Sequence, residues 1–363
     1  MRVIISGGGT GGHIFPAIAI ANEIKKRKPS SKILFVGAEN RMEMEKVPKA
    51  GYEIVGLPIQ GFQRRFTLKN FVFFLKLLSS LKKAKKIIKE FNPDVVVGTG
   101  GYASGPLIYK ATKYKIPALI QEQNSLPGIT NKILGKKVQK VCVSYEEAKR
   151  FFPEKKVVLT GNPVRNEIKN LLLDKQNENK EFFGFEANKP LLLVVGGSLG
   201  ALAINEAVHL SVEKFIDAGV QVLWQTGEMY YEKIDNKEEL KVKGIIAKKF
   251  IYEMDKAYSA ADFIVSRAGA MTISELAIVG KPAILVPSPY VAENHQYKNA
   301  MALVLRNAAI LVENEKVSEK LADVVIELNN NKKLQQTLSS NIKKFAMPNA
   351  TEKITDEIFN LLK

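Results

Sequence analysis

The residues best able to bind a charged ligand lie in three glycine-rich segments, Gly7–Gly12, Gly98–Gly105 and Gly196–Ala201. Each segment follows a short apolar run and precedes a helical pattern. Glycines let the backbone approach a ligand closely, and the N–H groups at a helix start attract anions. Because open α/β sheets bind ligands at the carboxyl ends of their strands, the three segments together predict a cleft for phosphate-bearing ligands. Any one segment alone could serve only to pack a helix tightly on its strand.

A fourth segment, Ser266–Glu275, has the same order of strand end, glycine turn and helix start. Its backbone N–H groups could hold a diphosphate, and Glu275, one turn into the helix, could accept hydrogen bonds from ribose hydroxyls. An acid in the first turn of a helix also complements the helix dipole without binding a ligand. Both roles stay open for Glu275.

The first segment also fits the dinucleotide fingerprint Gly7-x-Gly9-x-x-Gly12, and Glu39 at the end of the next apolar run could bind a ribose. A nicotinamide or flavin oxidoreductase is therefore an alternative. A phosphate-binding P-loop is disfavoured, because His13 rather than lysine follows Gly12.

Apolar runs alternate with helical patterns along the chain, which predicts an α/β fold with parallel sheets. The pattern restarts halfway: residues 191–195 begin a second set, and 262–266 and 281–286 repeat the order of 94–98 and 116–121. Further strands are expected over 3–5 and 33–37, a helix over 14–28, and a surface loop over the polar run 174–180. We therefore expect two facing Rossmann-like, doubly wound domains.

Composition narrows the class of protein. The 363 residues suffice for two cores, and 46% hydrophobic with 25% charged residues is typical of a soluble globular protein. The single cysteine, Cys142, excludes an internal disulfide framework, and no run is long enough to span a bilayer or resembles a signal peptide. A net charge of +17 indicates anionic partners. Since the basic residues are dispersed and no nucleic-acid motif occurs, we do not expect a nucleic-acid partner.

Taken in order, the motifs resemble those of the MurG-type N-acetylglucosaminyltransferases of peptidoglycan synthesis. The matching motifs cover nearly the whole chain: Gly7–Pro16, Gly100–Pro106, Gln121–Gly128, Gly161–Arg165, Gly196–Ala201, Ser266–Glu275 and Glu293–Gln296. The resemblance implies a GT-B fold and an inverting transfer of N-acetylglucosamine from UDP-N-acetylglucosamine to lipid I, an undecaprenyl-diphosphate-linked muramyl-pentapeptide, to give lipid II. No cofactor is expected. Alternatives are another GT-B enzyme that makes a different glycolipid, or a UDP-sugar epimerase.

The resemblance also implies a division of the chain. An N-terminal domain over 1–162 would face the acceptor and the membrane, and the last helix, 349–363, would rejoin it after the break at Pro348. A C-terminal domain over 163–348 would hold the UDP-sugar.

Carried over residue by residue, the resemblance implies fourteen donor contacts: Thr10, Gly11, Gly12, Asn124, Arg165, Ser198, Ile251, Ala270, Met271, Thr272, Ile273, Ser274, Glu275 and Gln296. We expect the acceptor diphosphate at the second glycine segment, at Gly100, Gly101, Tyr102 and Ser104.

Displacement by an acceptor hydroxyl needs a general base, and His13 and Glu122 are the candidates, because both lie on loops that follow predicted strands. His13 is preferred among the three histidines, since His209 lies in a helical pattern and His295 in a predicted loop. The ring of His13 could instead only order its turn. No Asp-x-Asp or His-Glu-x-x-His motif occurs, so we expect no metal, and Arg165 and helix N-termini would stabilise the departing UDP.

The segment Phe62–Lys89 predicts attachment to an anionic membrane surface. A helical projection from Phe73 to Phe91 places one apolar stripe, which includes Phe74 and Leu78, against the core. Outside it fall apolar residues and lysines together, as in a helix that lies in a lipid interface: Phe71, Val72, Leu75, Lys76, Lys82 and Lys86. We expect a peripheral protein on the cytoplasmic side of the cell membrane. The alternative is that a neighbouring loop buries these apolar side chains.

Overall fold

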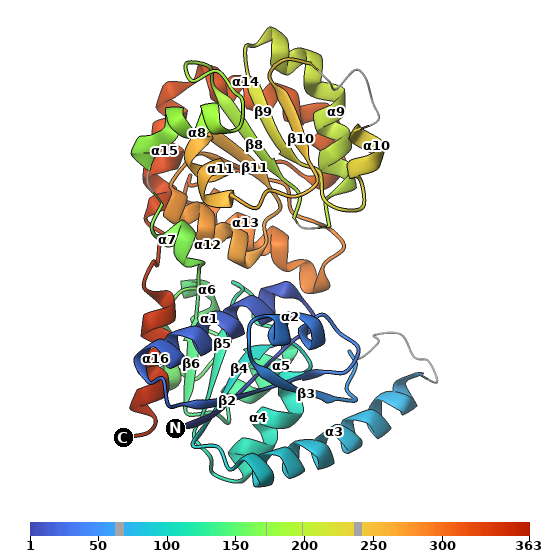
Figure 1. Cartoon of the computed structure of the whole chain (residues 1–363), viewed down its shortest axis with the longest axis vertical. Coiled ribbons are helices and arrows are strands. Elements are labelled where there is room, and N and C mark those ends of the chain that lie inside the picture. The colour runs from blue at the N-terminus through green and yellow to red at the C-terminus, as the bar shows by residue number, and fades with distance from the viewer. Residues whose placement is uncertain (62–68, 172, 198, 236–241) are drawn as a thin grey trace. The chain divides into compact units, whose positions relative to one another are not determined.

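Two parallel sheets, each with helices on both faces, organise the chain (Figure 1). This computed structural model describes residues 1–61, 69–171, 173–197, 199–235 and 242–363. The chain forms two units, Met1–Val164 with Met347–Lys363, and Arg165–Ala346. The predicted α/β class and the two doubly wound sheets are confirmed.

The sheet of the first unit has the strand order β3-β2-β1-β4-β5-β6-β7. Its strands are β1 Arg2–Gly7, β2 Lys32–Ala38, β3 Glu53–Leu57, β4 Val95–Gly100, β5 Ala118–Glu122, β6 Lys140–Val143 and β7 Val157–Leu159. All neighbours are parallel, and the strand order reverses between β1 and β4. Ligands of doubly wound sheets bind at this point of reversal. The first two glycine segments both lie there, because they follow β1 and β4.

Helices cover both faces of this sheet (Figure 1). They are α1 Gly11–Arg27, α2 Glu43–Lys49, α3 Lys69–Phe91, α4 Ser104–Lys113, α5 Ile129–Gly135, α6 Glu146–Lys149, the 3-10 turn η1 Glu154–Lys156, and α16 Ala350–Asn360. On one face Ile20 and Ile24 of α1 share a core with Ile354 and Ile358 of α16. The last helix is thereby fixed to the first unit.

The second unit repeats the plan with the strand order β10-β9-β8-β11-β12-β13. Its strands are β8 Leu191–Val195, β9 Gln221–Gln225, β10 Ile245–Lys248, β11 Phe263–Ser266, β12 Ala283–Leu285 and β13 Ile310–Leu311. All are parallel, and the order reverses between β8 and β11. The glycine turns after these two strands therefore lie at the ligand-binding edge of the second sheet.

The helices of the second unit surround a core centred on the fully buried Trp224 and Phe215. They are α7 Asn166–Lys169, α8 Gln176–Phe182, α9 Leu202–Asp217, α10 Tyr231–Asp235, α11 Met254–Ala260, α12 Ala270–Val279, α13 His295–Val304, α14 Val317–Asn330 and α15 Lys332–Lys343, with 3-10 turns η2 Leu173–Lys175, η4 Ala292–Asn294 and η5 Asn314–Lys316.

Two predicted loops are wrong. The polar run 174–180 forms η2 and most of α8, because Lys180 turns inward and its ammonium group lies 2.8 Å from a carboxylate oxygen of Asp262. A buried, paired lysine cannot be told from a solvated one by sequence pattern. His295, expected in a loop, is the first residue of α13, and its Nδ1 lies 2.8 Å from the carbonyl oxygen of Ala292.

The buried face of helix α3 is narrower than the apolar stripe that the helical projection predicts. Ser80, Ala84 and Ile88 are buried, whereas Phe74 and Leu78, expected in the core, are 56% and 64% exposed. They lie on the same exposed side as Leu75, which is 53% exposed. The buried face follows the contacts of α3 with α4, which a helical projection alone does not contain. Among the described residues, no helix combines the length and apolarity needed to cross a membrane.

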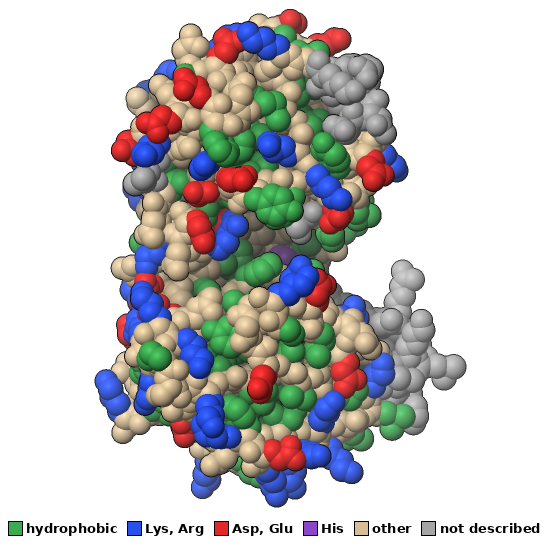
Figure 2. Space-filling model, viewed as in Figure 1, with side chains coloured by type: hydrophobic (Ala, Val, Ile, Leu, Met, Phe, Trp, Pro, Cys, Tyr) green, Lys and Arg blue, Asp and Glu red, His purple; other side chains and the backbone are tan. Residues whose placement is uncertain are grey.

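Basic side chains are dispersed over the face of the molecule in Figure 2, with acidic side chains between them. Several form exposed ion pairs, such as Lys49 with Glu45 at 2.8 Å and Lys249 with Glu228 at 2.8 Å. Such pairs contribute little to stability. This face therefore shows no single basic patch, and the net charge of +17 for the whole chain favours anions in general.

Candidate active site

The first glycine segment joins β1 to α1 and leaves a helix start exposed to solvent. Thr10 is the N-cap of α1 with extended dihedral angles (φ −148°, ψ 157°), and its side chain makes no capping hydrogen bond. Thr10 and Gly12 are exposed, and Gly11 is half-buried. The first N–H groups of α1 therefore form a site to which an anion is attracted.

Glu43, which the sequence did not single out, fixes the backbone of this segment through hydrogen bonds. Its carboxylate is fully buried and accepts hydrogen bonds from the backbone N–H of Gly9 at 3.0 Å and of Ala38 at 2.9 Å. The N–H of Gly9 thus already binds a carboxylate of the same chain. A Cβ atom at Gly8 would lie only 2.0 Å from Glu43 Oε1, which explains the glycine there.

His13 is oriented by two oxygen atoms. Its Nδ1 lies 3.0 Å from the carbonyl oxygen of Thr99 and 3.0 Å from Oε1 of Gln123. Because a carbonyl oxygen only accepts, this arrangement assigns the proton to Nδ1 and leaves the lone pair on Nε2. The amide of Gln123 in turn donates to Thr99 O at 2.7 Å, which fixes its orientation. Gln123 is a second residue that the sequence did not single out.

Glu122, the rival base, is enclosed by donors. It is fully buried and accepts from Asn131 Nδ2 at 2.8 Å, from the backbone N–H and the side-chain amide of Asn124 at 2.9 and 3.2 Å, and from Gly128 N at 3.3 Å. Burial raises the pKa of Glu122, against the lowering effect of these donors. The carboxylate holds the loop after β5, and Asn124 with it, and this arrangement favours His13 as the base.

The second glycine segment lies directly against the first. Gly100 and Gly101 have φ angles of +96° and +78°, and a Cβ atom at Gly101 would lie 2.3 Å from the carbonyl oxygen of Gly8. A Cβ atom at Gly100 would lie 2.9 Å from Nδ1 of His13. Tyr102 is half-buried beside Gly9. Ser104, expected at the acceptor diphosphate, is instead fully buried and donates to the carbonyl oxygen of Gly101 at 3.0 Å.

In the second unit, α12 begins at the carboxyl end of β11 with no side-chain cap, because its N-cap is Gly269. The N–H groups of its first turn belong to Ala270, Met271 and Thr272, and the i−4 hydrogen bonds begin with Ile273, whose N–H donates to Gly269 O at 2.9 Å. Since Ala270 and Ile273 are buried, any contact they make with a ligand uses the backbone. Ser274 donates its hydroxyl to Ala270 O at 3.0 Å.

Glu275, in the second turn of α12, is held between two donors. Nε of Arg165 donates to Oε1 at 3.0 Å, and the hydroxyl of Tyr258 donates to Oε2 at 3.1 Å. The side chain of Glu275 is only 12% exposed. Burial lowers the pKa of Arg165, but the neighbouring carboxylate more than offsets this and leaves it above its ordinary value. Glu275 lies beyond the first turn of α12, and its carboxylate is held in place by two side chains from other elements.

Two further residues expected to contact the UDP-sugar each already use one polar atom in a hydrogen bond within the chain. Oε1 of Gln296, in the first turn of α13, accepts from Ser288 N at 2.8 Å, so its amide nitrogen is the atom that would bind a ligand oxygen. Ile251 is buried and its N–H donates to Gln225 Oε1 at 2.9 Å, so a uracil contact at Ile251 would use its carbonyl oxygen. Ser198 lies outside the described residues.

Glu39, the acid that the dinucleotide alternative requires, forms an ion pair with Lys83 at 2.8 Å. In the part of the chain that the structure describes, no three His, Cys, Asp or Glu side chains are grouped so that they could hold a metal ion.

Comparisons with known proteins agree along the whole chain. The glycosyltransferase family 28 N-terminal domain matches residues 3–143, and the glycosyltransferase family 28 C-terminal domain matches residues 191–354. A UDP-N-acetylglucosamine–N-acetylmuramyl-(pentapeptide) pyrophosphoryl-undecaprenol N-acetylglucosamine transferase of Christiangramia forsetii is 52% identical over 363 residues, which cover 100% of this chain and 98% of the relative. A transferase of the same name from Cytophaga hutchinsonii is 53% identical and covers 99% of this chain and 97% of the relative.

Solved structures with a similar fold include a protein of the same kind as these relatives. The crystal structure of Acinetobacter baumannii MurG matches with a TM-score of 0.81 at 29% identity, over 99% of each chain. A UDP-GlcNAc 2-epimerase from Neisseria meningitidis matches with a TM-score of 0.67 at 16% identity, over 99% of this chain and 100% of the other, and shares the fold alone.

Proposed function

This chain belongs to glycosyltransferase family 28, and from that premise we propose that it transfers N-acetylglucosamine from UDP-N-acetylglucosamine to the muramyl sugar of lipid I, which gives lipid II in peptidoglycan synthesis. The observation that carries the proposal is the full-length identity of about half to transferases of that reaction. The oxidoreductase alternative loses its support, since both family domains are those of glycosyltransferases.

The second unit binds the donor in this proposal. The N–H groups at the start of α12 bind the diphosphate, Glu275 accepts from the ribose hydroxyls, and the amide nitrogen of Gln296 binds a sugar or phosphate oxygen. Arg165, 3.0 Å from Glu275 and half exposed, supplies positive charge for the diphosphate. In the first unit, the second glycine segment binds the acceptor diphosphate, and Thr10, Gly11, Gly12 and Asn124 keep the donor contacts that the resemblance implies.

The first unit also supplies the base. Nε2 of His13 takes the proton from the acceptor hydroxyl as the hydroxyl oxygen attacks C1 of N-acetylglucosamine, and the C1–O bond to UDP breaks with inversion at C1. The orientation of His13 by Thr99 O and Gln123 supports this assignment, because a base acts best when its reactive lone pair is fixed.

A direct test measures UDP release from UDP-N-acetylglucosamine in the presence of lipid I and of other polyprenyl-diphosphate acceptors. We expect release with lipid I and formation of lipid II. Release only with another acceptor would indicate a different glycolipid synthase. Conversion of the UDP-sugar without any acceptor would indicate an epimerase and contradict the proposal.

Transfer is expected to continue in EDTA at an unchanged rate. Arg165 and the start of α12 are cationic and dipolar groups that can stabilise the charge of the departing UDP without a bridging ion. The measurement is the rate of UDP release after dialysis against EDTA, with and without added Mg²⁺. A rate that falls on dialysis and returns with Mg²⁺ would contradict this prediction.

We further propose that the protein is a peripheral protein on the cytoplasmic face of the cell membrane and that α3 carries the contact. Phe74, Leu75 and Leu78 form an exposed apolar group on α3. Lys82, Lys85, Lys86 and Lys89 follow on the same helix and are exposed. Each lysine near an anionic leaflet adds about 1 kcal/mol to binding. Phe71 and Val72, expected in the same contact, have side chains outside the described residues, and Lys76 is half-buried with its ammonium group on Gln60 at 2.8 Å.

Substitution of Leu75→Ser together with Leu78→Ser is expected to abolish most of the sedimentation with anionic liposomes, while UDP affinity is unchanged. The reason is that insertion of two leucines contributes several kcal/mol of apolar burial in a lipid interface. A matched control is Leu210→Ser with Leu305→Ser, two leucines of the second unit that are 68% and 75% exposed. Equal sedimentation of the α3 variant and the parent protein would contradict the assignment.

A further inference from the structure

Tyr258 contacts the carboxylate of Glu275, which is proposed to bind the ribose. It is fully buried on α11, and its hydroxyl donates to Oε2 of Glu275 at 3.1 Å. Burial and the adjacent negative charge raise the pKa of Tyr258 well above its ordinary value, so the phenol keeps its proton and stays a donor. A buried neutral donor of this kind fixes the direction of the carboxylate that it contacts.

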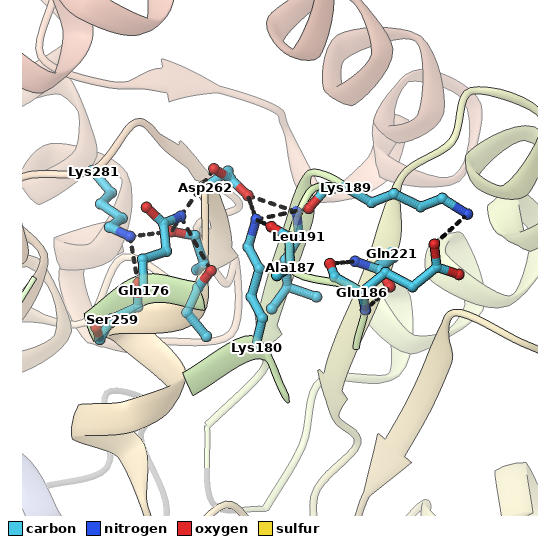
Figure 3. Close-up of polar contacts among 12 residues, drawn as sticks. Gln176, Lys180, Glu186, Ala187, Lys189, Leu191, Gln221, Ser259, Asp262 and Lys281 are labelled. Carbon is cyan, nitrogen blue, oxygen red and sulfur yellow. Dashed lines mark hydrogen bonds and ion pairs between the residues drawn. The ribbon is translucent and has the colours of Figure 1, made fainter. Parts of the chain in front are cut away.

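The end of α11 is anchored by a polar cluster, drawn in Figure 3. Nζ of Lys281 donates to the carbonyl oxygen of Ser259 at 2.6 Å and also to that of Ala261. Nε2 of Gln176 donates to Ala260 O at 3.3 Å, to Ala261 O at 3.2 Å and to Asp262 Oδ1 at 2.9 Å. These side chains satisfy the carbonyl groups that a helix leaves unpaired at its C-terminus.

The same cluster ties α11 to the sheet. Oδ2 of Asp262 accepts from the backbone N–H of Leu191, the first residue of β8, at 2.8 Å, and pairs with Lys180 at 2.8 Å (Figure 3). Tyr258 therefore belongs to a rigid element that is fastened at its end. Arg165, the other partner of Glu275, has a side chain that is 52% exposed. A bound diphosphate would compete with Glu275 for its positive charge. Of the two donors, Tyr258 is buried and uncharged, so we expect it to stay in place when an anion binds.

We propose that Tyr258 is a positioning residue for nucleotide selectivity: its hydroxyl fixes Glu275 so that the remaining lone pairs of the carboxylate accept from the two ribose hydroxyls. A carboxylate has about four lone-pair sites, of which Arg165 and Tyr258 use two, so two remain for two donors. This inference rests on the proposed function, because that proposal makes Glu275 the ribose ligand. The consequence is discrimination between ribose and 2′-deoxyribose nucleotides.

The experiment compares the affinities of wild type and Tyr258→Phe for UDP and for 2′-deoxy-UDP by calorimetry. Wild type is expected to bind UDP about tenfold more tightly, the value of one good hydrogen bond. In Tyr258→Phe the ratio is expected to fall below about threefold, mainly through weaker UDP binding, because a mobile carboxylate gains less from each hydroxyl. KM for UDP-N-acetylglucosamine should rise with kcat little changed.

A merely structural role for Tyr258 would lower both affinities by the same factor, and that result would overturn the inference. The matched control is Tyr145→Phe. Tyr145 is also buried, and its hydroxyl has no hydrogen-bond partner among the described residues, so neither affinity should change. If Tyr258→Phe does not fold, Glu275→Asp draws the carboxylate back from Tyr258, and retention of the wild-type ratio in that variant would equally overturn the inference.

Failure of the underlying proposal gives a different result. A wild-type protein that binds UDP and 2′-deoxy-UDP equally would remove Glu275 from the ribose site, and with it the inference. A wild-type protein that binds neither nucleotide would contradict the proposed donor itself.

Discussion

Replacement of His13 by alanine is expected to lower kcat for N-acetylglucosamine transfer by about 10²- to 10⁴-fold, the usual contribution of a general base. The ring is held by Thr99 O and by Gln123 Oε1, each 3.0 Å from Nδ1, so its Nε2 lone pair is the one that can take a proton. Affinity for UDP should change little, because the expected loss is confined to the chemical step. The measurements are single-turnover transfer to lipid I and calorimetry with UDP.

The controls for this prediction are a second histidine and the rival carboxylate. His209→Ala, in the middle of α9, should keep a normal turnover. Glu122→Ala removes a buried acceptor from four donor groups and should chiefly lower the melting temperature. Near-normal turnover in His13→Ala together with loss of turnover in a folded Glu122→Ala protein would assign the base to Glu122 instead.

The parts of the fold that sequence could predict are those that repeat a simple pattern. Buried parallel strands are continuous apolar runs, and glycine turns follow them, so both sheets and their ligand-binding edges can be predicted from Val3–Gly12 and Leu191–Ala201. Strand order decides which turns lie next to each other. A turn that follows a strand lies at the carboxyl end of that strand in any order. The prediction therefore needed no tertiary information.

The supporting residues of the site could not be predicted in this way. Glu43 and Gln123 act through atoms that are distant in sequence: Glu43 accepts from Gly9 N, 34 residues away, and Gln123 contacts His13, 110 residues away. A buried glutamate also looks like any acid in the first turn of a helix, as Glu43 is in α2. The exposed side of α3 could not be predicted for the same reason. Which apolar residues of a helix are buried depends on the elements that pack against it, and Phe74 and Leu78 are 56% and 64% exposed.

Replacement of Glu275 by alanine is expected to weaken binding of UDP and of UDP-N-acetylglucosamine by about 1.5–3 kcal/mol, the range for hydrogen bonds to a charged group. The loss corresponds to roughly 10- to 150-fold in Kd. The variant also removes the acceptor for Arg165 and Tyr258, whose donors lie 3.0 and 3.1 Å from the carboxylate oxygens, and so frees Arg165 from its place beside the helix start. Calorimetry with UDP measures the effect, and Ser198→Ala should act more mildly.

The control must separate ligand binding from the helix dipole, and the chain offers a matched residue. Glu319 is an exposed acid in the first turn of α14, so Glu319→Ala tests the loss of a dipole interaction alone in the same unit. That variant should lower stability by about 0.3–1 kcal/mol and leave UDP affinity unchanged. If Glu275→Ala behaved in the same way, with normal UDP affinity and a small loss of stability, Glu275 would be a dipole residue only. A large loss of affinity in Glu275→Ala alone would assign Glu275 to the nucleotide, because loss of a dipole interaction, which Glu319→Ala tests, does not weaken UDP binding.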